Sequence, residues 1–197
     1  MPAPASLVLG TRNPHKLREF GRLLAPAAIS VEPLAAGIDL PAETGSSFED
    51  NALPKARAAA AATGRISIAD DSGIEAEALG GRPGVRSARY AGLGAGDEAN
   101  LDRLLREAPV GSGLRYACAL AFVDPQGAKE KVFFGYCGGR LATQVAGSGG
   151  FGYDPAFLPD GDHDGRTMAQ LSDAEKDAIS HRGAAVRALL DWLSAPA

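Results

Sequence analysis

The chain has few cysteines and no long apolar segment. Its 197 residues include two cysteines, Cys118 and Cys137, which lack metal-binding spacing and stand in strand-like segments, so we expect buried thiols. No segment approaches the roughly 18 consecutive apolar residues of a membrane span, and the start at Met1 has neither the basic nor the apolar part of a secretory signal. We therefore expect a cytoplasmic protein without a membrane partner.

The sequence also lacks an excess of basic residues. Its formal net charge is -4, whereas binding to a nucleic-acid backbone requires a basic surface. We therefore expect no nucleic-acid partner. The composition, 45% hydrophobic and 22% charged residues, is ordinary for a globular protein that buries a sizeable core. We predict a single domain over residues 1–197.

Several familiar catalytic and cofactor motifs are missing as well. Gly147–Gly152 fits the spacing of a dinucleotide fingerprint, but Tyr153–Pro155 follows where the helix of that motif should begin. The chain has no P-loop motif and no serine in a nucleophile elbow, and its histidines, His15, His163 and His181, do not form a metal-binding pair on a helix. Covalent catalysis therefore has no candidate nucleophile.

The first pattern that is present is a strand, a loop and a helix. Leu7–Leu9 is typical of a short buried strand, Asn13 is a natural N-cap, and Pro14 suits the first position of a helix. The N-terminus of such a helix presents backbone N–H groups and a positive dipole end. Lys16 in the first turn is unfavourable on dipole grounds. Either an anionic ligand or a simple solvated lysine explains it.

The second pattern is a helix followed by an acidic strand. Ser46–Asp50 has capping-box spacing before a helix through Ala62, which places Asn51 and Lys55 on one face. A strand over Arg65–Ala69 should then end at Asp70–Gly73. Adjacent carboxylates repel one another unless a cation or a proton lies between them. We consider a metal or phosphate site and, as the alternative, an acidic turn in solvent.

The third pattern combines a glycine-rich segment with a cationic one. Gly149–Pro155 has glycines that let the backbone approach a ligand, with Phe151 and Tyr153 as faces for a planar ring. Ser172–Arg182 follows and contains Lys176, His181 and Arg182, all able to donate hydrogen bonds to a carbonyl or a phosphate. Together the two segments suggest a nucleotide site. Separately, they are equally typical of a turn beside a core aromatic residue and of a charged helix end.

Other segments mainly indicate the α/β fold. Leu114–Val123 and Lys131–Gly138 flank a turn and predict an antiparallel hairpin. Asn100–Glu107 predicts a short helix, and Ser180 can cap a C-terminal helix. The arginine-rich loop Gly81–Tyr90 would contact either phosphate or a neighbouring subunit.

The remaining charged residues suit metal-assisted attack on a nucleoside triphosphate. Lys16 and Lys55 would neutralise phosphates, and the carboxylates of Asp70 and Asp71 would hold Mg²⁺ and orient or deprotonate water. Two other functions stay open. One is a non-catalytic nucleotide-binding or sensing module, and the other is a phosphatase that releases inorganic phosphate.

Seven segments, in this order, carry a resemblance to a known family: Thr11–Lys16, Phe48–Ala52, Lys55–Arg57, Ala69–Gly73, Pro83–Tyr90, Gly150–Pro155 and Glu175–Arg182. The chain closely resembles the inosine/xanthosine triphosphate pyrophosphatases, which clear non-standard purine nucleotides. The resemblance implies an α/β fold, elongated and two-lobed around a long mixed sheet with flanking helices, and an active-site cleft between the lobes. It also implies a homodimer and Mg²⁺-dependent hydrolysis of dITP, ITP and XTP to the monophosphate and pyrophosphate.

The resemblance also assigns roles to individual residues. Asp71 is implied as metal ligand and proton acceptor, and Asp70, Lys16 and Lys55 complete the catalytic group. The implied triphosphate-binding residues are Thr11, Arg12, Asn13, Pro14, His15, Lys16 and Ser72. The implied nucleoside-binding residues are Phe151, Gly152, Tyr153, Asp154, Lys176, His181 and Arg182.

The sequence departs from the family pattern in three places. Pro14-His15 replaces a smaller or glycine-containing pair, and Asp177 stands where asparagine is frequent. Ala42 occupies a position that often carries an acidic metal-site residue. Either the neighbouring Glu43 serves as the second metal ligand, or the metal shell contains more water.

Overall fold

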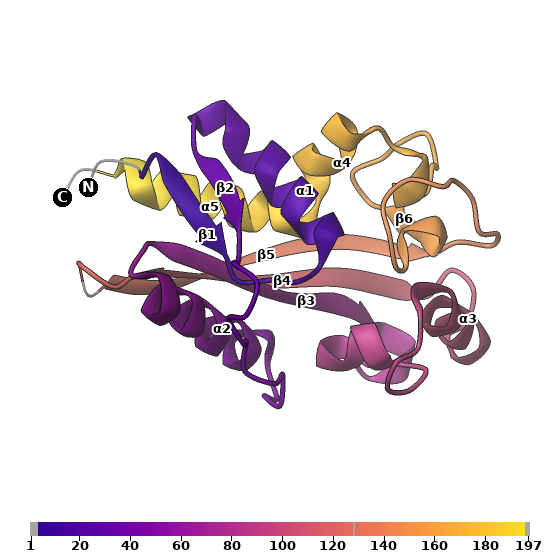
Figure 1. Cartoon of the computed structure of the whole chain (residues 1–197). Coiled ribbons are helices and arrows are strands. Elements are labelled where there is room, and N and C mark those ends of the chain that lie inside the picture. Colours follow the sequence, from indigo (N-terminus) through magenta and orange to yellow (C-terminus); the bar gives the residue numbers. More distant parts are fainter. Residues whose placement is uncertain (1–3, 128, 196–197) are drawn as a thin grey trace. The chain divides into compact units, whose positions relative to one another are not determined.

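The computed structural model describes residues 4–127 and 129–195, and the chain divides into two compact units (Figure 1). Unit 1 comprises Met1–Asp71, Cys118–Gly135 and Arg182–Ala197, and unit 2 comprises Ser72–Ala117 and Tyr136–His181. The predictions of one domain over residues 1–197 and of a cleft between two lobes stay predictions. Within the described ranges, no helix is long and apolar enough to cross a membrane.

The strands form one mixed six-stranded sheet in the order β2-β1-β3-β4-β5-β6. They are β1 (Ser6–Leu9), β2 (Ser30–Pro33), β3 (Ser67–Ala76), β4 (Gly113–Asp124), β5 (Lys129–Leu141) and β6 (Phe157–Pro159). β1 pairs in parallel with both β2 and β3, with Leu7 opposite Val31 and Leu9 opposite Ile68, while β6 is antiparallel to β5. Parallel neighbours require crossover connections, which explains why helices separate the first three strands. The predicted α/β fold with a mixed sheet is confirmed.

Several of the helices begin where a side chain caps them. The helices are α1 (Pro14–Leu24), α2 (Phe48–Thr63), α3 (Asp97–Glu107), α4 (Asp173–Ile179) and α5 (His181–Ser194). The Asn13 side chain accepts hydrogen bonds from the backbone N–H groups of His15 and Lys16, which confirms the predicted N-cap. Capping boxes begin α2 at Ser47 and α4 at Ser172. α3 starts before the predicted Asn100, because acidic residues in its first turn favour the helix dipole.

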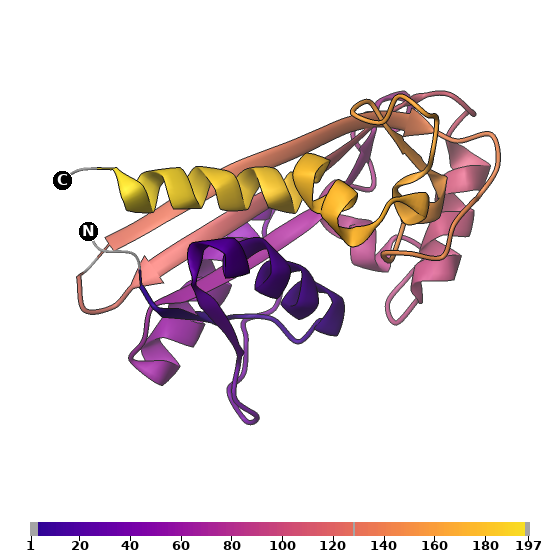
Figure 2. The same ribbon diagram turned by 90° about the horizontal axis from the view of Figure 1, so that it is seen from above.

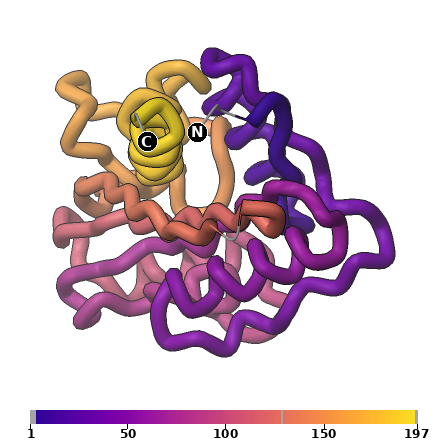
Figure 3. The backbone as a smooth tube through the Cα atoms, turned by 90° about the vertical axis from the view of Figure 1, so that its left-hand side faces the viewer, coloured from indigo at the N-terminus to yellow at the C-terminus, as the bar shows by residue number. Residues whose placement is uncertain are grey.

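Unit 1 buries a different kind of core on each face of its strands. On one face, α1 and α5 cover large side chains, among them Leu9, Leu120 and Phe122. Figure 2 shows α1 and α5 lying over the same face, and Figure 3 shows α5 and α2 on opposite sides of the strands. The α2 face is made mainly of alanines, namely Ala52, Ala56, Ala60, Ala69, Ala119 and Ala121. This alternation is the two-residue period of strands buried on both faces.

Unit 2 has its own core. Its fully buried members include Ile74 of β3, Leu104 of α3, Leu141 of β5 and Met168, which belongs to one of several short 3-10 segments. Tyr116 and Phe157 pack ring against ring there, with their centroids 4.5 Å apart. Because this core reaches the residues next to the glycine-rich segment, it can hold that segment in one conformation.

The acidic strand differs from its predicted form. We expected a strand that ends at Asp70, but β3 continues through Asp70, Asp71 and Ser72 to Ala76. The carboxylates do not end the strand because buried cations and an amide compensate for their charge, as described below. The strands at the predicted hairpin are neighbours in the sheet and extend over Gly113–Asp124 and Lys129–Leu141. Both cysteines are buried and free, as predicted.

Candidate active site

Asp70 is the centre of a buried charged group in unit 1. Its side chain is fully buried, and its Oδ2 lies 3.0 Å from Lys16 Nζ and 3.2 Å from Arg182 Nε. Lys55 Nζ donates to the Asp70 backbone carbonyl over 2.7 Å. Burial by itself would raise the pKa of Asp70, but the positive charges of Lys16, Arg182 and Lys55 hold that pKa well below its ordinary value. Asp70 is therefore a fixed anion rather than a proton acceptor.

A second carboxylate, Glu19, belongs to the same group. Arg182 Nη1 donates to Glu19 Oε2 over 2.9 Å, and both side chains are buried. Burial would lower the pKa of Arg182, but Asp70 and Glu19 raise it. Glu19 was not among the predicted site residues. The available signal was its place three residues after Lys16, on the same face of α1.

Asp71, the next residue of β3, has a different environment. Its Oδ2 accepts a 2.8 Å hydrogen bond from Asn51 Nδ2. Burial raises the pKa of Asp71, and the nearby charge of Glu43 raises it further, against the lowering effect of Asn51 and the two lysines. A carboxylate with a raised pKa accepts a proton more readily than an ordinary one. Of the two aspartates, Asp71 is therefore the better general base.

Lys55 links Glu43 to this strand. Its Nζ lies 2.5 Å from Glu43 Oε1 and also donates a hydrogen bond to the Asp70 backbone carbonyl. Thus Glu43 belongs to the same charged region as Asp71. Among the described residues, no three or more His, Cys, Asp or Glu side chains are arranged to hold a metal ion. One or two carboxylates suffice for Mg²⁺, however, because this ion keeps several waters and binds substrate phosphates, so Asp71 and Glu43 are a suitable donor set.

The predicted triphosphate loop lies at the N-terminus of α1. Thr11 Oγ1 accepts from the Asn13 backbone N–H over 3.2 Å, and Asn13 caps the helix. Arg12 instead donates to three backbone carbonyls, those of Leu34, Ala35 and Ile38, at 2.8, 3.0 and 2.6 Å. The guanidinium of Arg12 therefore fastens the segment after β2 to the loop. His15 Nδ1 lies 2.9 Å from Arg18 Nη2 on the exposed side of α1, and Pro14 begins the helix.

In unit 2, Asp154 organises the glycine-rich segment. Its Oδ2 accepts from Lys176 Nζ over 2.7 Å and from the Phe151 backbone N–H over 2.9 Å, and its Oδ1 accepts from the Tyr116 hydroxyl over 3.0 Å. Gly150 has a φ of +68°, and a Cβ atom there would lie 2.0 Å from Asp154 Oδ2. A side chain at Gly150 is thus excluded on both grounds. Asp154 and Lys176 hold the segment in place.

The two predicted aromatic faces differ. Tyr153 is 6% exposed, its ring belongs to the core of unit 2, and its hydroxyl donates to the Ser87 carbonyl over 2.8 Å. This placement corrects the expectation that Tyr153 offers a face to a ligand, because its ring is used in packing. Phe151 is only partly buried and lies beneath Lys176 Nζ, which is 5.4 Å from the ring centroid. Phe151 is therefore the face that a planar ring can reach.

The other predicted residues of unit 2 lie close to this group. The His181 ring stacks on Tyr116, with centroids 4.7 Å apart and planes inclined by 9°. The Gly152 backbone N–H donates to Asp97 at the start of α3 over 2.9 Å, and Ser72 is partly buried on β3. Tyr116 was missed by sequence reasoning because it stands in a continuous apolar strand pattern. The structure pairs Arg182 with the acids of unit 1, so its predicted contact with the base stays a prediction.

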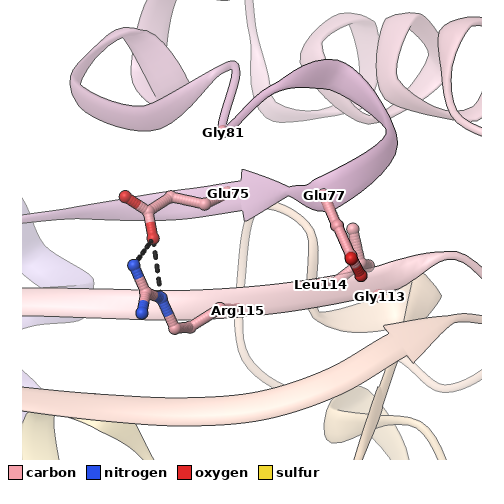
Figure 4. A pocket seen from close by; sticks show the side chains of 6 residues that line it. All are labelled: Glu75, Glu77, Gly81, Gly113, Leu114 and Arg115. Carbon is pink, nitrogen blue, oxygen red and sulfur yellow. Dashed lines mark hydrogen bonds and ion pairs between the residues drawn. The ribbon is translucent and has the colours of Figure 1, made fainter.

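A hollow of about 310 Å³ in unit 2 is a different feature. It is lined by Glu75, Glu77, Gly81, Gly113, Leu114 and Arg115, none of which is a predicted site residue. Figure 4 shows the Arg115 guanidinium turned toward the Glu75 carboxylate, and the two groups lie 2.7 Å apart. The charges of Glu75 and Arg115 therefore compensate each other.

Comparison with known proteins shows a likeness along almost the whole chain. The model of the Ham1 family matches residues 7–192. A protein of Frankia alni named dITP/XTP pyrophosphatase is 49% identical over 198 residues, covering 95% of this chain and 96% of its own, and one of the same name from Mycolicibacterium paratuberculosis is 48% identical, covering 95% of each. The solved structure of the Staphylococcus aureus Ham1 protein has 38% identity and a TM-score of 0.80, covering 95% of this chain and 97% of its own.

Proposed function

We propose that this chain, which belongs to the Ham1 family, hydrolyses non-standard purine nucleoside triphosphates, among them dITP, ITP and XTP, to the monophosphate and pyrophosphate. The observation that carries the proposal is the likeness, over 95% of the chain, to proteins named dITP/XTP pyrophosphatase. The paired aspartates of β3 and the lysines beside them supply the chemical reason. A nucleotide-binding or sensing module is the alternative, but binding alone does not require an acidic pair.

The opposite environments of the two aspartates suggest how the reaction proceeds. Attack of water on the α-phosphorus forms a new P–O bond, breaks the bond to the bridging oxygen and releases pyrophosphate. The water must lose a proton, and we propose Asp71 as its acceptor, because Asp70 is held as an anion by Lys16 and Arg182. Asp70 stays ionised and holds Lys16 in place.

The cations and a metal ion would compensate the charge of the triphosphate. The Thr11–Lys16 segment offers the N-terminus of α1, and Lys16 and Lys55 lie beside the aspartates. We propose Mg²⁺ as the cofactor, held by Asp71 together with Glu43, which takes the place of an acidic residue at Ala42. When bound, Mg²⁺ would neutralise phosphate oxygens and polarise the phosphate under attack.

Base selection is assigned to the group around Phe151. We propose that the base stacks on Phe151, and that Lys176, His181 and Arg182 supply donors for a 6-oxo group. Adenine presents an amino donor at that position, which would leave a buried donor unpaired at a cost of roughly 1–3 kcal/mol, or about 5- to 150-fold. ATP should therefore be a poor substrate.

The test is a panel of purine nucleoside triphosphates with Mg²⁺ present and absent, in which phosphate and pyrophosphate are measured separately. We expect Mg²⁺-dependent release of pyrophosphate from ITP, dITP and XTP. Release of inorganic phosphate would move the attack to the γ-phosphorus and establish the phosphatase function instead. Saturable binding without turnover would establish the sensing module.

The assembly follows the family resemblance, whereas the location and partners follow from the composition of the sequence. We propose a homodimer in the cytoplasm, with no nucleic-acid partner. Sedimentation equilibrium of the purified protein measures the first point, since a dimer has twice the mass of the 20.2 kDa chain.

A further inference from the structure

Asn51 occupies an unusual position for its residue type. It lies in the second turn of α2, and it is only 3% exposed. Asparagine is a poor residue for a helix interior, because its side chain competes with the backbone for hydrogen bonds. A buried carboxamide also costs free energy unless both of its ends are hydrogen-bonded. The side chain of Asn51 must therefore be stabilised by specific partners.

Both ends of the Asn51 side chain are hydrogen-bonded. Nδ2 donates to Asp71 Oδ2 over 2.8 Å, and Oδ1 accepts from the Gly45 backbone N–H over 2.7 Å. The amide cannot be reversed, because a carboxylate at Asp71 cannot donate and a backbone N–H at Gly45 cannot accept. Asn51 thus connects the strand that carries Asp71 to the segment just after Glu43.

The segment at Gly45 is packed tightly against α2. A Cβ atom at Gly45 would lie 2.4 Å from Asp50 Cβ and 2.8 Å from Asn51 Oδ1. Only glycine fits without displacement of the segment. The hydrogen bond from Gly45 to Asn51 therefore depends on a close approach of the Gly45 backbone to α2, which the absence of a side chain at Gly45 allows.

We propose that Asn51 is a positioning residue for the hydrolysis reaction, which orients the Asp71 carboxylate and fixes the Glu43 segment relative to it. By donating a hydrogen bond to Asp71 Oδ2, the Asn51 carboxamide determines the direction in which Asp71 Oδ1 points. By holding Gly45, it limits the movement of Glu43, which also forms an ion pair with Lys55, one turn further along α2. The inference rests on the proposed function, since it assigns a role to Asn51 in that reaction.

The central variant is Asn51→Leu, which keeps the number and branching of the side-chain heavy atoms and removes both hydrogen bonds. We expect kcat for ITP to fall about 10- to 100-fold, the usual effect of losing a residue that orients a metal ligand, while KM changes less than about threefold. Direct binding of Mn²⁺, followed by electron paramagnetic resonance without nucleotide, should weaken about 10-fold or more. The Mn²⁺ measurement does not depend on turnover.

Asn51→Asp separates the two bonds. It keeps an acceptor for Gly45 but replaces the donor that faces Asp71 with a carboxylate, so kcat should fall at least as far as in Asn51→Leu. It also keeps the size of the side chain, and it serves as the second test if the leucine variant does not fold. A kcat within about threefold of wild type in either folded variant would overturn the proposal.

Asn100 provides the matched control. It is also a buried asparagine in a helix, and its Oδ1 accepts from the Ala91 N–H over 2.8 Å while its Nδ2 donates to the Ala88 carbonyl over 3.2 Å. Asn100→Leu should lower the urea-unfolding free energy about as much as Asn51→Leu, with kcat within about threefold of wild type. An equal loss of kcat in both variants would reduce Asn51 to a structural role and overturn the proposal. If wild type released no pyrophosphate, the proposed function would fail instead.

Discussion

Each unit contains a buried aspartate that accepts from a lysine, but the two aspartates are compensated differently. Asp70 of unit 1 is held by Lys16 and Arg182, at 3.0 and 3.2 Å. Asp154 of unit 2 has one cation, Lys176, and otherwise accepts from a hydroxyl and a backbone N–H. Charged partners suit a site for a triphosphate and a metal ion. Neutral donors suit a site that holds a loop in place beneath an uncharged base.

A buried carboxylate is therefore not by itself a sign of a catalytic role. Asp70 and Asp154 are both anchors, and each fixes the groups around it. Asp71 is the exception, because its partners leave its pKa raised. If this difference holds, the chemistry depends mainly on residues of unit 1 and the choice of base mainly on residues of unit 2.

The largest effect is expected for Asp71→Asn. The change keeps the size of the side chain but removes the charge that a water proton requires, so kcat for ITP should fall about 10²- to 10⁴-fold. The unfolding midpoint in urea should change little. A near-normal rate in this variant would show that Asp71 has no catalytic role. The distinction between Asp70 and Asp154 as anchors and Asp71 as the base would then be wrong.

Arg182→Ala should cause the largest loss of stability. It leaves Asp70 and Glu19 buried without their shared guanidinium, which costs about 3–5 kcal/mol of unfolding free energy. Urea unfolding followed by circular dichroism measures it. If Arg182 also serves the base, KM for ITP should rise and the preference for ITP over ATP should shrink. If hydrolysis of every triphosphate slowed by the same factor, Arg182 would serve phosphate binding and not the choice of base.

The pH dependence of stability should identify Asp70 as an anchor. Its folded-state pKa lies below the unfolded value, so its stabilising effect is present above about pH 4, the ordinary aspartate pKa, and is lost as the pH falls further. Asp70→Asn should be less stable than wild type at pH 7, and the difference should narrow toward pH 3. Urea unfolding at several pH values tests this, and a constant difference would contradict it.

The smallest effect is expected for Tyr153→Phe. The change removes the hydrogen bond to the Ser87 carbonyl and keeps the ring in the core, so it should cost about 1 kcal/mol of unfolding free energy. Because the Tyr153 ring packs in the core of unit 2, we expect KM for ITP to stay within about twofold. Phe151→Ala, in contrast, should raise KM clearly. A similar rise in both variants would show that both rings serve the ligand.

Sequence reasoning reached those features that depend on local chemistry. The Asn13 cap follows from one residue and its neighbours, and so does the capping box at Ser47. The paired aspartates were noticed because adjacent carboxylates need compensation. However, the cations that compensate them lie far away along the chain. The strand β3 continues past Asp70 because Lys16 and Arg182 contact the Asp70 carboxylate.

The residues that were missed are those defined by tertiary contacts. Tyr116 looks like any aromatic residue in a buried strand, and only the fold brings its hydroxyl to Asp154. Glu19 looks like a surface acid of an amphipathic helix until Arg182 is placed beside it. The expectation for Tyr153 differs from the structure in the opposite way. Its neighbours Phe151 and Gly152 suggested a ligand surface, whereas its own ring packs in the core.

The alanine face of α2 determines how closely this helix approaches the strands. Because Ala52, Ala56 and Ala60 face Ala69, Ala119 and Ala121, the helix backbone can approach the strands closely, and a side chain as short as that of Asn51 can reach Asp71. The constraint on these alanines is therefore one of volume rather than of hydrophobicity. A leucine at Ala56 would be just as apolar, yet it would push the helix outward and withdraw Asn51 and Lys55 from β3. In this part of the molecule, small core residues act as spacers that bring polar side chains within range.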